Sequence, residues 1–180
     1  MTWDAFHRRG EVLRTVVEVA NSRRDGAIPM QLPGVAEAFG DATSLVAALQ
    51  LRWHTRLAGQ IERALCDEPA QLETAVLTAW RRTASELPGV LAILDTCTEQ
   101  PTDPRMAEAL TRAHSKDWVL MAAMAGQAGA ADLVAARLGR MLEEKARSAY
   151  DPAASRPATA ATTTSQPSTL LERVMAHLAA

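Results

Sequence analysis

Two arginines and a histidine lie close together in the middle of the chain, and these residue types could bind an anion. Arg52 and Arg56 are four residues apart in the stretch LVAALQLRWHTRLAGQIERAL, residues 45–65, with Trp53 and His54 between them. Like charges at this helical spacing repel each other unless an acid from another helix or a ligand anion lies between them. The pattern leaves two interpretations open. Either the arginines form salt bridges with acids of other helices, or Arg52, His54 and Arg56 form a site for an anion or another ligand.

Trp53 itself belongs to an apolar stripe that recurs at every fourth residue of the same stretch. Residues four apart advance by about 40° beyond a full helical turn, so the stripe winds by about 200° around the helix. Ridges of this kind interdigitate with those of another helix at about −50°, as in globular helix packing. We therefore expect Trp53 to be a core residue. The stripe consists of Leu45, Leu49, Trp53, Leu57, Ile61 and Leu65.

Two further sets of polar residues have spacings that suit chemistry. Asp4, His7 and Glu11 fall on one helical face and could offer ligands to a metal, but this face is also well placed for ordinary surface ion pairs. We therefore expect no metal site. His114 and Asp117, at i and i+3, could form a base and its orienting carboxylate, although no nucleophile is identifiable from the sequence.

Catalytic and cofactor-binding motifs are missing from the sequence. It contains no GxSxG, P-loop, HExxH or EF-hand pattern, and no GxGxxG follows a strand. We expect no catalytic residues and no cofactor, and the sequence favours a protein that is not an enzyme. The feature that would favour an enzyme is a cleft that brings His54 or His114 next to a carboxylate.

Composition excludes several partner classes. The 180 residues carry a formal net charge of −2, so no basic surplus favours nucleic acid. No stretch approaches the roughly 20 apolar residues of a membrane span, and no signal peptide is recognisable, which predicts a cytoplasmic protein without a membrane partner. Cys66 and Cys97 lack ligand spacing and are expected to be small buried side chains in a reducing compartment.

The spacing of apolar residues predicts helices throughout residues 1–150. No segment shows the alternation of β-branched residues, bounded by turns, that would predict a strand. We expect an all-α fold, an irregular bundle of six or seven helices. Polar residues 114–117 leave open a polar helix edge or a helix break, and Pro69 is expected near the first turn of another helix. The expected helical segments cover residues 2–20, 35–39, 41–66, 69–87, 90–97, 104–113, 118–125 and 133–150.

The last thirty residues divide into a linker and a short tail. Residues 151–167 are mostly Ala, Ser, Thr and Pro and are expected to be a disordered linker. In residues 168–180, Thr169 and Glu172 fit a capping box, which predicts a short amphipathic helix. We expect this tail to bind its own body, a second copy of the chain in a homodimer, or another protein. Its partner-binding face would consist of Leu170, Leu171, Val174, Met175 and Leu178.

A second interpretation comes from a resemblance to TetR-type regulators. The residues Arg9 to Leu13, followed by Phe39-Gly40-Asp41 and the helix through Trp53, resemble the flanks of the DNA-binding domain in that family. The stretch between Ala20 and Phe39 is too short to hold a helix-turn-helix. The resemblance implies an all-α small-ligand sensor or dimerisation domain without DNA binding, with a buried cavity near Trp53 and residues 118–125.

Overall fold

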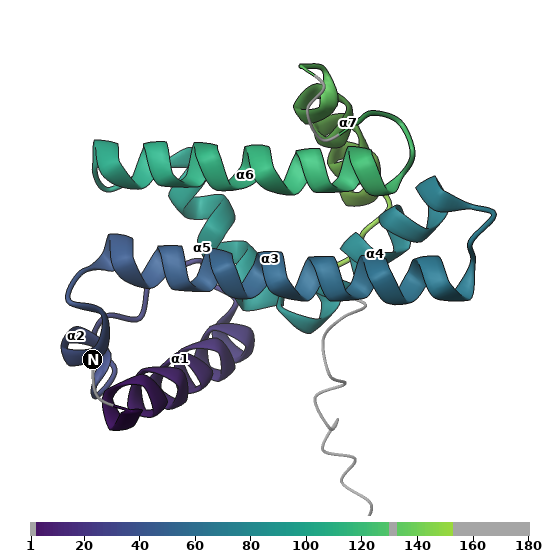
Figure 1. Ribbon diagram of the computed structural model, residues 1–180. Coiled ribbons are helices and arrows are strands. Elements are labelled where there is room, and N and C mark those ends of the chain that lie inside the picture. The colour runs from purple at the N-terminus through teal and green to yellow at the C-terminus, as the bar shows by residue number, and fades with distance from the viewer. Residues whose placement is uncertain (1–2, 130–132, 153–180) are drawn as a thin grey trace, which may run out of the picture.

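The computed structural model describes residues 3–129 and 133–152, which form seven helices and contain no strand (Figure 1). The all-α prediction is therefore confirmed. The predicted tail helix, and all of the linker after Pro152, lie outside the described residues. The helices are α1 (Trp3–Arg23), α2 (Val35–Phe39), α3 (Ala42–Asp67), α4 (Leu72–Glu86), α5 (Pro88–Glu99), α6 (Pro104–Met124) and α7 (Ala135–Ser148).

Aspartate side chains cap the starts of two helices. The side chain of Asp41 accepts a hydrogen bond from the amide of Ser44 at 2.7 Å, and that of Asp103 accepts one from the amide of Met106 at 2.9 Å. Each aspartate thereby satisfies one of the unpaired amides at a helix N-terminus. Asp103 also accepts a hydrogen bond from the hydroxyl of Thr43 at 2.9 Å, which ties the start of α6 to the start of α3.

The structure corrects one local prediction and decides between two alternatives that the sequence left open. Pro69 precedes α4, which begins at Leu72, because residues 68–71 form a turn instead of the first helical residues. The polar run at residues 114–117 does not interrupt α6, which continues unbroken to Met124. Asp117 is buried there and is hydrogen-bonded by side chains of α3, so its polarity is satisfied without a break in the helix.

The core forms around the winding apolar stripe of α3, as predicted. Leu45, Leu49, Leu57 and Ile61 are fully buried, and Trp53 is only 5% exposed. The ring of Trp53 meets that of Trp80 on α4 edge to face at 5.9 Å, and Trp80 meets Tyr150 in the same way at 6.0 Å. This arrangement is favoured for aromatic pairs and fixes α4 and the end of α7 against the centre of α3.

The long helices α3 and α6 lie side by side, and α7 rises steeply beside the end of α6 (Figure 1). Helix α1 packs mainly on α5 and α2 and meets α3 over a small area, so the flanks of α1 and α3 diverge. No helix among the described residues is long and apolar enough to cross a membrane. Cys97 is buried as expected, but Cys66 is exposed because it lies at the outer end of α3.

Candidate functional site

The predicted cluster of Arg52, His54 and Arg56 is divided between two sides of α3. Residues two apart on a helix point about 200° away from each other. Accordingly Arg52 and Arg56 face α1, whereas His54 faces α6. The structure therefore brings the two arginines to one surface and places the histidine in a different environment.

The arginine side of α3 forms one wall of an open cleft of ≈ 610 Å³, which we call the α1–α3 cleft. Arg56 forms an ion pair with Glu86 at the end of α4, and the amide of Gln60 donates a hydrogen bond to the same carboxylate at 2.7 Å. The hydrogen bond from Arg56 lowers the pKa of Glu86. The cleft is lined by Gly10, Leu13, Arg14, Val17, Glu18, Asn21, Arg52, Arg56, Glu86 and Leu87.

The two interpretations of the arginine pair thus apply to different members of it. Arg56 forms an ion pair with the carboxylate of Glu86, as the salt-bridge interpretation expects. Arg52 and Arg14 both line the α1–α3 cleft, and within residues 3–129 and 133–152 neither has an ion-pair partner. The cleft therefore combines the exposed charges of Arg14, Arg52 and Glu18 with the apolar side chains of Leu13, Val17 and Leu87.

On the other side of α3, His54 and Gln50 both contact Asp117 of α6. Nδ1 of His54 lies 2.5 Å from Oδ1 of Asp117, and the amide of Gln50 donates to Oδ2 at 2.8 Å. The Asp117 side chain is 6% exposed, whereas that of His54 is 39% exposed. Burial raises the pKa of Asp117 by more than the hydrogen bonds and the nearby His54 and His114 rings lower it. His54 therefore lies next to a carboxylate but lines neither of the two large clefts, whereas His114 lines a large cleft that also contains Asp95 and Glu143.

The raised pKa of Asp117 predicts a pH dependence of stability. The folded protein holds this proton to a higher pH than the unfolded chain, whose carboxyl titrates near the ordinary value of 3.8. The stability of the wild type relative to Asp117→Asn should therefore fall as pH rises from this value through the pKa in the folded state. Chemical denaturation of both proteins between about pH 4 and pH 7 measures the difference. The same comparison in a His54→Gln background removes the contribution of its partner, and a difference that grows with pH would contradict the prediction.

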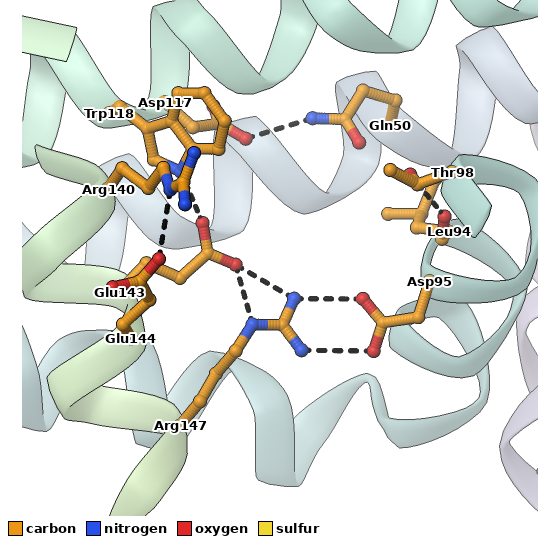
Figure 2. A network of polar contacts seen from close by, with 10 residues as sticks. All are labelled: Gln50, Leu94, Asp95, Thr98, Asp117, Trp118, Arg140, Glu143, Glu144 and Arg147. Carbon is orange, nitrogen blue, oxygen red and sulfur yellow. Dashed lines mark hydrogen bonds and ion pairs between the residues drawn. The ribbon is translucent and has the colours of Figure 1, made fainter. Parts of the chain in front are cut away.

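A second polar network joins α5, α6 and α7 (Figure 2). The guanidinium of Arg147 donates two hydrogen bonds to Asp95, at 2.8 and 3.0 Å, and another to Glu143 at 2.8 Å. It also lies over the ring of Trp80, 5.0 Å from the ring centre. The indole N–H of Trp118 donates to the other oxygen of Glu143 at 2.5 Å. Because the guanidinium of Arg147 bonds both oxygens of Asp95 in a bidentate pair and one oxygen of Glu143, this network holds α7 against α5.

This network was not predicted from the sequence. Glu143 and Arg147 are four residues apart on a helix, a spacing that predicts a pair, and Asp95 is a lone acid within the apolar segment 90–97. These patterns could have indicated the Glu143–Arg147 pair. The partner of Asp95 could not be predicted, because Arg147 lies 52 residues away in the chain and is brought to Asp95 by helix packing.

The network lines a second open cleft of ≈ 620 Å³, which we call the α5–α7 cleft. On its α6 wall the ring of His114 lies tilted at 42° to that of Trp118, with ring centres 5.9 Å apart. The lining residues are Asp95, Thr98, Glu99, His114, Trp118, Arg140, Glu143, Glu144 and Arg147. Carboxylates therefore outnumber arginines in this cleft, in contrast to the α1–α3 cleft.

Among the residues that the structure describes, no group of three or more His, Cys, Asp or Glu side chains could hold a metal ion. Comparisons of the chain with protein-family models, with curated proteins and with solved structures find no match.

Proposed function

We propose that this chain is a helical interaction protein whose residues 168–180 form an amphipathic docking helix, and that this helix binds in the α1–α3 cleft of its own body. The observation that carries the proposal is the cleft itself, an open groove of ≈ 610 Å³ with an apolar wall and a charged edge. An amphipathic helix binds such a groove by laying its apolar face on the wall while its polar face stays in water.

The residues on both sides have matching chemistry. Leu13, Val17 and Leu87 offer an apolar surface for the expected face through Leu171 and Val174. The free guanidinium groups of Arg14 and Arg52 can pair with an acid of the docked segment, and Glu172 supplies one. An isolated helix of this length is marginal in water, so the tail needs a surface on which to fold.

The last described residues lie near this cleft, which supports the proposal. The carbonyl of Pro152 accepts a hydrogen bond from Arg24 at 3.4 Å, and Arg24 in turn donates to the carbonyl of Asn21, a residue of the cleft wall. A flexible linker of the length of residues 151–167 has a root-mean-square reach of roughly 20–25 Å. The tail can therefore reach the cleft of its own chain, at a high effective concentration.

A small-ligand sensor related to the TetR type is less well supported than an interaction protein. That interpretation expects a buried cavity near Trp53 and residues 118–125. The space enclosed between Trp53, Trp80 and Met121 measures ≈ 10 Å³, which is room for about one water molecule. The large spaces lined by described residues are open clefts at the surface, where segments of protein dock.

Deleting residues 168–180 tests the proposal. The melting temperature of the shortened chain should stay close to that of the full chain, because the core around Trp53 does not depend on the tail. The emptied cleft should then bind the added peptide 168–180, detected by fluorescence anisotropy of a labelled peptide, whereas the full chain should bind it more weakly. A large loss of melting temperature, or equal peptide binding by both chains, would show that the tail has another role.

A further inference from the structure

A buried polar atom with no partner lies next to the α5–α7 cleft. Gln50 is 5% exposed, and its amide nitrogen donates to Asp117, but its side-chain oxygen Oε1 has no hydrogen-bond partner. Figure 2 shows this oxygen turned away from the hydrogen bond to Asp117. A buried acceptor without a hydrogen-bond partner destabilises the folded protein, and a donor bound next to Oε1 would remove that destabilisation.

A narrow void beside Gln50 borders the α5–α7 cleft. It measures ≈ 10 Å³, and its lining includes Gln50, Asp117, Trp53 and Trp80. Its size is that of one water molecule, and therefore also of one ammonium group. The residues that line both the narrow void and the ≈ 620 Å³ cleft are Asp95, His114, Glu143 and Arg147.

The charges along this path favour a cation. Arg147 is bonded by two carboxylates, those of Asp95 and Glu143, so the three side chains together keep a negative charge. Arg140 is paired with Glu144, and Glu99 lines the cleft without an ion-pair partner among the described residues. Trp118 exposes an aromatic ring beside them, and aromatic faces attract organic cations.

We propose that the α5–α7 cleft binds a small organic cation with a primary ammonium group, which donates a hydrogen bond to Oε1 of Gln50. The rest of the ligand lies along Trp118 and the carboxylates of the outer cleft. The three N–H donors of a primary ammonium find acceptors in Gln50 and Asp117, whereas a quaternary ammonium has no donor and a neutral alcohol has no charge. This site is independent of the proposed docking of the tail, because it lies on the opposite side of α3 from the α1–α3 cleft.

Isothermal titration calorimetry of the full chain with butylamine, butanol and tetramethylammonium tests the proposal. Butylamine should bind, and the other two should bind at least about tenfold more weakly because each lacks the N–H donors or the charge. Binding of butylamine and butanol with equal affinity, or no binding of butylamine, would overturn the proposal and leave a water molecule as the partner of Gln50.

The chain offers a matched control for the role of Gln50. Gln60 lies on the same helix, is 2% exposed and also has an unpartnered side-chain oxygen, but it faces Glu86 near the other cleft. Gln50→Met should weaken butylamine binding by about tenfold or more, whereas Gln60→Met should leave it unchanged. Equal effects of the two substitutions would show that the amine does not bind at Gln50.

A surface substitution keeps the proposal testable if Gln50→Met does not fold. Glu99→Gln removes one exposed carboxylate of the outer cleft and should weaken the binding of spermidine, whose further ammonium groups extend along that wall. Glu108→Gln removes an exposed carboxylate of α6 that pairs with Arg112 and lies outside the cleft, and it should have no effect. Unchanged spermidine binding in Glu99→Gln would contradict the placement of the ligand.

Discussion

Gly139→Ala should destabilise the protein by about 3 kcal/mol, because α7 crosses α6 at this residue with no room for a side chain. A methyl group built on Gly139 overlaps the backbone carbonyl of Trp118, which lies within α6. Relief requires the two helices to separate, since a carbonyl held within a helix cannot turn away. The separation would also disturb the hydrogen bond from Trp118 to Glu143 and the position of Arg147.

Two other helical glycines are matched controls for this substitution. A methyl group added at Gly10 in α1 or at Gly59 in α3 meets no atom within 4 Å. Alanine at either position should raise the free energy of unfolding by about 0.5–1 kcal/mol, through its higher helix propensity alone. Chemical denaturation of the three variants measures the contrast, and a Gly139→Ala variant as stable as Gly59→Ala would disprove the close packing of α6 and α7.

Trp53→Ala should destabilise the protein by about 3–5 kcal/mol, the range observed when large core side chains are truncated. Trp53 is the midpoint of the apolar stripe of α3, and its ring packs on the edge of Trp80. Its removal leaves a cavity beside Gln50 and Asp117, which then lose an apolar cover. The control Leu51→Ala changes a residue of the same helix that is 64% exposed and should alter stability by less than about 0.5 kcal/mol. A loss below about 1 kcal/mol in Trp53→Ala would place this side chain outside the core.

Local features of the fold were predictable because they depend on residues close together in sequence. The short helix Val35–Phe39 and the start of α6 at Pro104 both follow from neighbours within one turn. The sequence left the continuity of α6 open, because the polarity of Asp117 is satisfied by Gln50 and His54, which are far away in the chain.

The candidate sites depend on contacts between distant residues more than the helices do. The sequence singled out Arg52, His54 and Arg56, but only the packing of α1 and α6 on α3 shows that the arginines and the histidine belong to different surfaces. The α5–α7 cleft was missed because Asp95, Trp118 and Arg147 come from three helices. The unpartnered oxygen of Gln50 is likewise a property of its surroundings, since glutamine has no distinctive sequence pattern.

The central claim is that the tail docks in the α1–α3 cleft. A measurement of the rotational freedom of the tail tests this claim most directly. A fluorophore is attached to the full chain through Ala180→Cys in a Cys66→Ser background, because Cys97 is buried and Cys66 is exposed. The label should show high anisotropy at all protein concentrations, since docking occurs within one chain. Val174→Asp in the tail and Leu13→Gln in the cleft should both lower it, whereas Arg63→Glu, exposed on α3 outside the cleft, should not. Low anisotropy in the unsubstituted chain, or high anisotropy that persists in Leu13→Gln, would contradict docking of the tail in this cleft.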